Sequence, residues 1–153
     1  MSERTRYEAN VCVLLHRAGR WLLAVRSPGV AYAAGQVGLI GGHVEPVVGP
    51  DVFESTARRE VAEETGLDLT GVSLHYLSSE LYLGDAGQPV LTVTYVGELA
   101  DGVEPRVTAP DELSAVGWWS LSELDTVENC APWVPPLVAA AERLLAGSEL
   151  RRR

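Results

Sequence analysis

The sequence predicts an α/β domain in which helices cover both faces of a mixed β-sheet. Runs typical of strands are interleaved with two well-separated helical segments, and no repeat, long linker or low-complexity stretch interrupts them. The chain has 153 residues, 46% of them hydrophobic, which suits one globular domain with its own core and leaves no room for a second catalytic domain. We expect this domain over residues 10–147, between an N-terminal extension at 1–9 and a short basic tail at 148–153.

A β-hairpin is predicted near the N-terminus. Apolar residues alternate from Val11 to Leu15, the pair Ala18-Gly19 favours a turn, and a second apolar run covers residues 21–25. The segment SPGVAYAAGQ, residues 27–36, has the composition of a loop. The short apolar run at residues 37–40 then predicts a buried strand.

The glycine pair Gly41-Gly42 closes that strand, and the pattern beyond it becomes helical. Glycine at both positions favours a tight turn of the chain. Asp51 fits the N-cap of the helix, with Glu54 three residues later as in a capping box, and Gly66 stands just past the helix end. The predicted helix therefore makes about four turns and ends at Thr65.

The second half of the chain predicts another hairpin, a short strand and a C-terminal helix. The hairpin strands cover residues 74–83 and 90–99 around the turn sequence GDAGQP. A polar loop leads to the strand AVGWW, and SLSEL starts a helical turn that the Pro-rich ENCAPWVPP breaks. An Ala/Leu-rich helix is expected over residues 137–146, ending at Gly147.

Composition excludes several kinds of chemistry. Twelve basic and twenty-one acidic residues give a net charge of −9. A negatively charged protein repels the phosphate backbone, so we expect no long nucleic acid as partner. Every basic residue is Arg, so there is no Lys for a Schiff base or a Walker-type loop. Cys12 and Cys130 lie far apart and no apolar run has the length of a membrane span. Without a zinc motif, a membrane anchor or a secretory signal, we expect a cytoplasmic protein with two free thiols.

Three carboxylates share one face of the predicted long helix. Glu60, Glu63 and Glu64 are spaced i, i+3 and i+4, which places them within an arc of about 100°. Like charges at this spacing repel one another, so the cluster needs a compensating cation. Carboxylate oxygens without His or Cys favour Mg²⁺ or Mn²⁺, and the alternative interpretation is a solvated helix face.

The stretch from Arg59 to Leu67, REVAEETGL, continues this acidic face and, with Gly42 upstream, resembles the motif of the Nudix hydrolase family. The second half of that motif is complete here. In the first half, residues 43–50 make eight residues between Gly42 and Asp51 where the family has five, and Asp51 replaces the family's Glu. We interpret Asp51 as a structural N-cap. The resemblance spans residues 10–145 and implies an α/β/α sandwich with a mixed central sheet.

The resemblance also implies roles for the residues of the motif. Glu60, Glu63 and Glu64 correspond to metal-binding carboxylates. Gly42 corresponds to a ligand through its backbone carbonyl. Arg59 corresponds to the residue that orients the glutamates by ion pairing.

A further metal-binding glutamate is implied in the loop ahead of the Trp-containing strand. Glu112 matches that position best, and its acidic neighbours Glu98, Glu104 and Asp111 are the alternatives. A carboxylate beside the cluster can act as the general base, and Glu63 and Glu112 are the two candidates, which the sequence does not rank.

The family's substrates are nucleoside diphosphates linked to another moiety, or related organic pyrophosphates. Mg²⁺ or Mn²⁺ polarises the phosphate oxygens of such small molecules and lowers the pKa of a bound water. No Ser, Cys or Lys is placed as a nucleophile, so we expect direct attack of water on phosphorus.

Three residues are candidates for substrate contact. Arg26 ends an apolar strand where related sequences often have a phosphate-contacting Arg, and His43 directly follows the glycine pair. Trp133 lies in the Pro-rich segment and can stack on a base. The upstream signature of coenzyme A pyrophosphatases is incomplete, because Ala31 replaces its Arg, which argues against a coenzyme A specialist.

Two other functions compete with a pyrophosphohydrolase. One is a Nudix-fold module that senses or binds nucleotides without catalysis, and the complete set of three helix carboxylates argues against it. The other is an RNA 5′-end pyrophosphohydrolase, against which the acidic balance and the absence of Lys both count.

Overall fold

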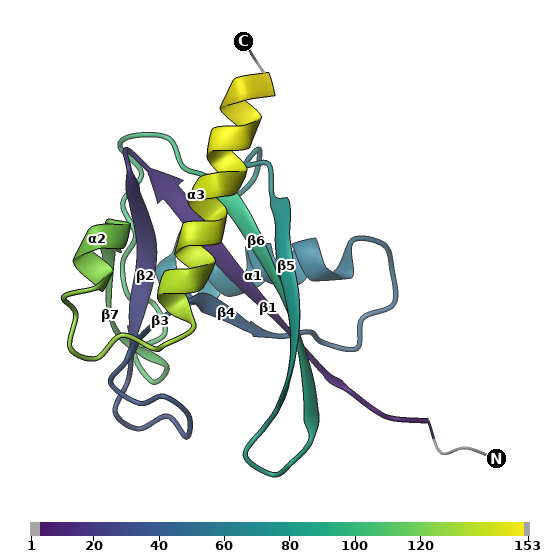
Figure 1. Ribbon diagram of the computed structural model, residues 1–153. Helices are drawn as coiled ribbons and strands as arrows, with labels where there is room; N and C mark the ends of the chain where they lie inside the picture. The colour runs from purple at the N-terminus through teal and green to yellow at the C-terminus, as the bar shows by residue number, and fades with distance from the viewer. Residues whose placement is uncertain (1–3, 152–153) are drawn as a thin grey trace.

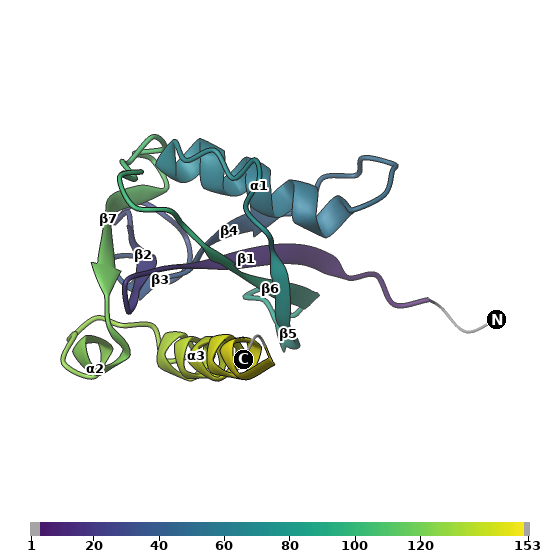
Figure 2. The ribbon, with the colours of Figure 1, turned by 90° about the horizontal axis from the view of Figure 1, so that it is seen from above.

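The computed structural model describes residues 4–151 and arranges them in three layers. A seven-stranded sheet forms the middle layer, α1 covers one face of it, and α2 and α3 lie on the other side (Figures 1 and 2). The strands are β1 (Glu8–Arg17), β2 (Arg20–Arg26), β3 (Val37–Gly38), β4 (Ile40–His43), β5 (His75–Leu83), β6 (Pro89–Glu98) and β7 (Leu113–Trp119). The helices are α1 (Val52–Thr65), α2 (Leu121–Leu124) and α3 (Val134–Arg151). The predicted α/β/α sandwich with a mixed central sheet is confirmed.

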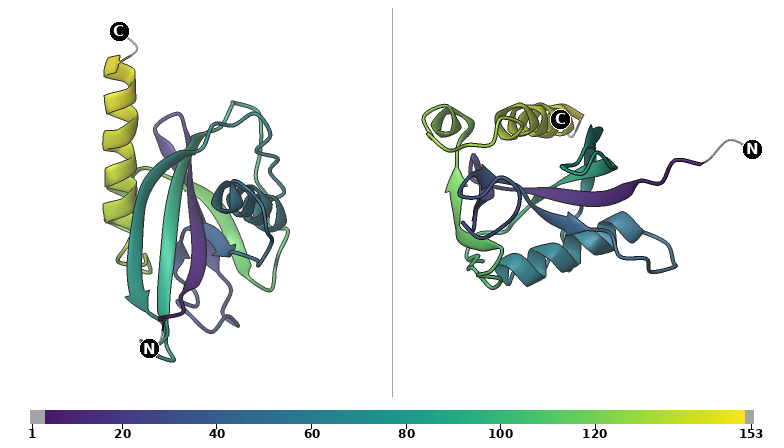
Figure 3. Two further views of the ribbon diagram at one scale, coloured as in Figure 1. Left: turned by 90° about the vertical axis from the view of Figure 1, so that its right-hand side faces the viewer. Right: turned by 90° about the horizontal axis from the view of Figure 1, so that it is seen from below.

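On one side of the central strand β1, the neighbouring strand changes from β4 to β2 partway along its length. On one side it pairs in parallel with β6 from Glu8 to His16. On its other side it pairs antiparallel with β4 over residues 10–13, and then with β2 over residues 15–17. The sheet therefore divides between β4 and β2, and Figure 3 shows it from two further sides, with α3 and α1 on opposite faces.

Strand alternation divides the core into two clusters. Val11, Val13 and Leu15 of β1 face the cluster beneath α1, whereas Leu14 faces the cluster beneath α3. The predicted first hairpin forms, and its turn uses the positive φ angles of Ala18 (48°) and Gly19 (77°). Within residues 4–151, no helix has the length and apolar character required to cross a membrane.

Helix α1 has the predicted C-terminus and an unexpected N-terminus. Gly66 adopts the left-handed conformation (φ 69°) and donates its N–H to the carbonyl of Ala62. Asp51 occupies the N-cap position, but its side chain makes no capping hydrogen bond and its own φ is 52°. The predicted N-cap position of Asp51 is confirmed, whereas the side-chain cap and the capping box with Glu54 are wrong, because a side-chain cap needs an extended N-cap backbone.

The predicted C-terminal helix and the short strand also need correction. Helix α3 begins at Val134, because Pro135 and Pro136 fit its first turn, where backbone N–H groups make no hydrogen bond within the helix. The helix continues through Gly147 to Arg151. The apolar run at residues 37–40 divides at Leu39, since β3 pairs with β2 and β4 pairs with β1.

Both predicted domain boundaries fall inside elements of the structure. Strand β1 already pairs with β6 at Glu8, and α3 runs beyond Gly147, where the hydroxyl of Ser148 donates to the carbonyl of Leu144. Arg152 and Arg153 of the predicted basic tail lie outside the described residues.

Candidate active site

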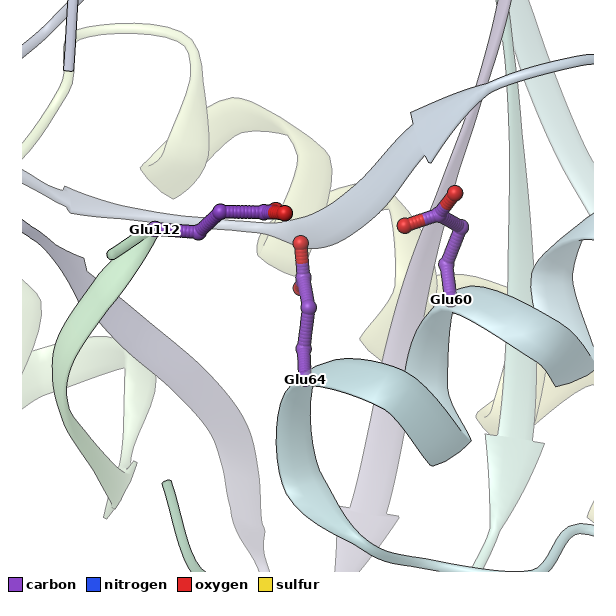
Figure 4. Close-up of side chains that lie close together, drawn as sticks. All are labelled: Glu60, Glu64 and Glu112. Carbon is purple, nitrogen blue, oxygen red and sulfur yellow. The ribbon is translucent and has the colours of Figure 1, made fainter. Parts of the chain in front are cut away.

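Three glutamates converge on the α1 side of the sheet. Carboxylate oxygens of Glu60, Glu64 and Glu112 all lie within 4.8 Å of one another. Glu60 and Glu64 rise from successive turns of α1, and Glu112 reaches toward Glu64 from the turn directly before β7 (Figure 4). We call these three side chains the acidic cluster.

The end of β2 holds the turn that carries Glu112. Ser27 is 5% exposed, its N–H donates to the carbonyl of Glu112 (2.9 Å), and its hydroxyl donates to the carbonyl of Pro110 (2.8 Å). Among the described residues, none of the alternatives Glu98, Glu104 and Asp111 belongs to the acidic cluster, and Glu104 forms an ion pair with Arg17 at 3.0 Å. Long-range bonds between β2 and the turn therefore bring Glu112, rather than Glu104, to the helix.

The loop before that turn is fastened to the end of α1. The hydroxyl of Thr108 donates to the carbonyl of Glu63 (2.6 Å), and its N–H donates to the carbonyl of Glu64 (3.1 Å). The N–H of Arg106 donates to the carbonyl of Thr65 (3.0 Å). These bonds satisfy the last carbonyls of α1 and fix the spacing between Glu64 and the Glu112 turn.

The glycine pair lies directly against the acidic cluster. Gly41 donates its N–H to Glu64 Oε2 at 3.4 Å. A Cβ on Gly42 would lie within 2.6 Å of both carboxylate oxygens of Glu60, so the space beside this glycine belongs to that carboxylate. A Cβ on Gly41 would collide with the backbone carbonyl of Val11 in the neighbouring strand. Gly42 is required because the Glu60 carboxylate lies against it, and Gly41 is required because the backbone of β1 lies against it.

Arg59 joins the helix to the end of β4. Its Nη1 forms an ion pair with Glu45 (2.7 Å), and its Nη2 binds Glu60 (2.7 Å) and the carbonyl of His43 (2.9 Å). Its Nε lies 3.9 Å from Glu63, whose side chain is 59% exposed. Glu63 therefore lies beside Arg59 and outside the acidic cluster.

Burial raises the pKa values of the two helix carboxylates, Glu60 and Glu64. Glu64 is 4% exposed, and burial, followed by the charges of Glu112 and Glu60, raises its pKa to about 8. Burial also raises the pKa of Glu60, against the opposing effect of Arg59. Three converging oxygen donors with an excess of negative charge suit a hard divalent cation, and the missing side chain of Gly42 gives the carboxylate of Glu60 its place beside β4.

None of the three predicted substrate residues belongs to the acidic cluster. Arg26 ends β2 and its Nε donates to the carbonyl of Tyr32 (2.7 Å), in the loop over residues 27–36. His43 ends β4 with an exposed side chain. Trp133 is half-buried beside the core cluster of α3, and its ring stacks on Tyr32 with centroids 5.6 Å apart and planes 13° apart.

Sequence reasoning missed Ser27, Thr108 and Tyr32. Each acts through a contact with a distant segment: Ser27 with the Glu112 turn, Thr108 with α1 and Tyr32 with Trp133. No spacing rule within a single segment marks such residues, so the sequence offered no signal for them.

A comparison of families and a comparison of structures both relate this chain to NUDIX proteins. The family model described as NUDIX domain matches residues 6–141, whereas no curated protein matches the sequence. The fold is similar to that of a MutT NUDIX hydrolase from Burkholderia pseudomallei, with 26% identity and a TM-score of 0.68 over 88% of this chain and 98% of that one.

Two more distant structures share the fold. The NUDIX domain of Shewanella oneidensis NrtR, complexed with ADP ribose, is 21% identical with a TM-score of 0.74, covering 93% of this chain and 90% of that one. A C. elegans Ap4A hydrolase is 18% identical with a TM-score of 0.69, covering 92% of this chain and 98% of that one.

Proposed function

Because the chain belongs to the NUDIX family, we propose that it is a metal-dependent enzyme that hydrolyses the pyrophosphate bond of a nucleoside diphosphate linked to another moiety. The family match and the MutT-type neighbours make it a hydrolase of pyrophosphate bonds. The observation that carries the proposal is the convergence of Glu60, Glu64 and Glu112 from two segments distant in sequence.

The donor set supports a site for Mg²⁺, or for Mn²⁺ in its place. Glu60, Glu64 and Glu112 would hold the ion, with the carbonyl of Gly42 and the nearby Glu63 as the further ligands that the family motif implies. When bound, such an ion polarises the phosphate oxygens and lowers the pKa of a coordinated water. It would also oppose the burial and the like charges of Glu112 and Glu60, which together raise the pKa of Glu64.

Carboxylates of the chain would handle the proton of the attacking water. We propose Glu112 as the general base, because its exposed side chain lies in the acidic cluster, whereas Glu63 lies outside it beside Arg59. The water oxygen forms a bond to phosphorus, the bridging P–O bond breaks, and the departing phosphate keeps the electron pair while Glu112 takes the proton. Arg59 positions Glu60 through their 2.7 Å ion pair.

The surroundings of the acidic cluster support a small nucleotide as substrate. The similar structures include a NUDIX domain with ADP ribose and an Ap4A hydrolase, both of which concern nucleotides with linked phosphates. We assign Arg26 and His43 to phosphate contacts and Trp133 to the base. The longer loop over residues 43–50 lines a hollow beside Arg59, which gives it a part in substrate fit.

The location follows from the same proposal. Cys12 and Cys130 are free, which fits the reducing cytoplasm in which nucleotide pools occur.

A substrate panel tests the proposal directly. Nucleoside triphosphates, dinucleoside polyphosphates, ADP-ribose, sugar nucleotides and cap analogues are incubated with Mg²⁺, and product release is measured with and without excess chelator. We expect chelator to abolish hydrolysis, and Glu64→Gln and Glu112→Gln each to lower kcat by at least about 100-fold. Glu98→Gln, at the exposed end of β6, is the matched control.

Four outcomes would contradict parts of the proposal. Turnover in excess chelator would remove the metal role, and nucleotide binding without hydrolysis of any panel member would favour the sensing module. A larger kcat loss in Glu63→Gln than in Glu112→Gln would move the base to Glu63. Reaction in ¹⁸O-water should label a phosphate product, and a trapped covalent enzyme intermediate would refute direct attack.

A further inference from the structure

The longer loop over residues 43–50 begins as a fixed continuation of β4. Val44 is half-buried against the core beneath α1, and its N–H donates to the carbonyl of Ala9 (2.8 Å) just before the paired part of β1 with β4. The carbonyl of the next residue, Glu45, accepts the N–H of Val47 (2.7 Å), which closes a tight turn. The backbone of Glu45 is therefore held on both sides, although its side chain is 64% exposed.

The guanidinium of Arg59 spans the space between this loop and the acidic cluster. Its Nη1 forms the ion pair with Glu45, and its Nη2 binds both Glu60 and the carbonyl of His43. A guanidinium is planar and its nitrogens have a fixed spacing, so partners at both Nη atoms set the direction in which the group points. Glu60 therefore receives its hydrogen bond from a group whose other end is held by Glu45.

A third carboxylate competes for the same guanidinium. Glu63 lies one helical turn after Arg59, and its carboxylate is 3.9 Å from Arg59 Nε. That nitrogen is buried and has no hydrogen-bond partner among the described residues. Turning the guanidinium toward Glu63 would give Nε a partner and would draw Nη2 away from Glu60. The ion pair with Glu45 holds the guanidinium against that turn.

Glu45 is the carboxylate that reaches Arg59 from outside α1. The ion-pair partners of Arg59 in the described part of the chain are Glu45, Glu60 and Glu63, and the last two belong to α1 itself. Asp51, at the other end of the loop, is exposed and is not among them. The charge through which the longer loop acts on Arg59 is therefore that of Glu45.

We propose that Glu45 is a positioning residue for the acidic cluster, which holds Arg59 so that Arg59 directs Glu60, and which balances the charge of Arg59 beside a bound cation. Without the carboxylate of Glu45, Arg59 turns to Glu63 and Glu60 loses the group that orients it. The unbalanced guanidinium also repels a divalent cation more strongly. This inference rests on the proposed function and adds to it a residue that lies outside both α1 and the acidic cluster.

Cation binding in the absence of substrate tests the inference apart from hydrolysis. Mn²⁺ alone is titrated by calorimetry into the full chain and into Glu45→Gln, which keeps the shape of the side chain and removes its charge. We expect Glu45→Gln to bind Mn²⁺ about ten-fold more weakly. In hydrolysis assays, its kcat should fall at limiting Mg²⁺ and recover at saturating Mg²⁺, where the KM for the nucleotide should match that of the wild type.

A double-mutant cycle shows whether Glu45 acts through Arg59. If it does, Glu45→Gln should change the Mn²⁺ affinity by less than about two-fold in a protein that already carries Arg59→Gln. Glu104→Gln is the matched control, because Glu104 is 70% exposed and pairs with Arg17 at 3.0 Å without belonging to the acidic cluster. Its Mn²⁺ affinity should equal that of the wild type.

Thermal melting of the metal-free variants distinguishes positioning from a structural role. Exposed ion pairs contribute little to stability, so Glu45→Gln and Glu104→Gln should both melt close to the wild type. A lowered melting temperature in Glu45→Gln, with the Mn²⁺ affinity reduced alongside it, would assign Glu45 to the fold and overturn the inference.

Other results would overturn it as well. Equal Mn²⁺ affinity in the wild type and Glu45→Gln would do so while leaving the proposed hydrolysis intact. A ten-fold loss that persists in the Arg59→Gln background would show that Glu45 does not act through Arg59. The absence of Mn²⁺ binding by the wild type would refute both this inference and the proposed metal dependence.

Discussion

The glycine pair allows the site to be perturbed without disturbing the sheet. In Gly42→Ala, the new Cβ would lie 2.5 and 2.6 Å from the two carboxylate oxygens of Glu60, whereas ordinary contact begins at 3.4 Å. The carboxylate must therefore retreat by about 0.9 Å (3.4 − 2.5), several times the tolerance of about 0.2 Å for a metal ligand. The colliding atoms are the free end of a side chain, so the fold should accommodate the change.

We expect Gly42→Ala to weaken Mg²⁺ or Mn²⁺ binding by about 10- to 100-fold and to lower kcat/KM by a similar factor. Its melting temperature should stay near that of the wild type. Alanine lowers the conformational entropy of the unfolded chain, which stabilises the folded state by about 0.4–1 kcal/mol and offsets the cost of moving Glu60. Calorimetric metal titration, thermal melting and steady-state kinetics are measured on the same preparation.

Gly41→Ala is the matched control with the opposite expected result. Its Cβ would meet the carbonyl of Val11 and lie 2.9 Å from Cα of Cys12, so β1 and β4 would have to separate. We expect a loss of about 3 kcal/mol or more in the free energy of unfolding. The reasoning is refuted if Gly42→Ala keeps its metal affinity within two-fold, or if it loses as much stability as Gly41→Ala.

Three further outcomes are expected. The raised pKa of Glu64 means that its carboxyl holds a proton in the folded metal-free protein between pH 4.5 and about 8, so the free energy of unfolding should fall by up to about 5 kcal/mol as pH rises through that window. In urea unfolding, Glu64→Gln or added Mg²⁺ should make this free energy depend less on pH. An unchanged pH dependence in Glu64→Gln would show that Glu64 is not its cause. Ser27→Ala should cost about 1–2 kcal/mol and also lower kcat/KM several-fold by loosening the Glu112 turn, so a loss of stability with unchanged kcat/KM would show that Ser27 does not position Glu112. Asp51→Gly should hold or raise the melting temperature and leave kcat/KM unchanged, because the residue has φ 52° and makes no side-chain cap; a loss above about 1 kcal/mol would show that the carboxylate stabilises α1.

The sequence by itself determined the local elements and the acidic helix face. Apolar alternation predicted the first hairpin, the turn sequence GDAGQP predicted the second, and the glycine after Thr65 predicted the end of α1. The spacing of Glu60 and Glu64 placed their side chains one above the other on α1, because four residues advance a helix by slightly more than one turn. These features depend on neighbours within a few positions, so a local pattern contains them.

Only the tertiary structure decided which other groups join that face. Glu112 meets Glu64 because Ser27 and Thr108 bind its turn and the preceding loop to β2 and α1, whereas Glu63, on the same helix, stays exposed beside Arg59. Asp51 fails as a side-chain cap because the backbone that enters α1 is left-handed there. The position of Glu112 is set by hydrogen bonds that connect segments tens of residues apart, and no periodicity within one segment records them.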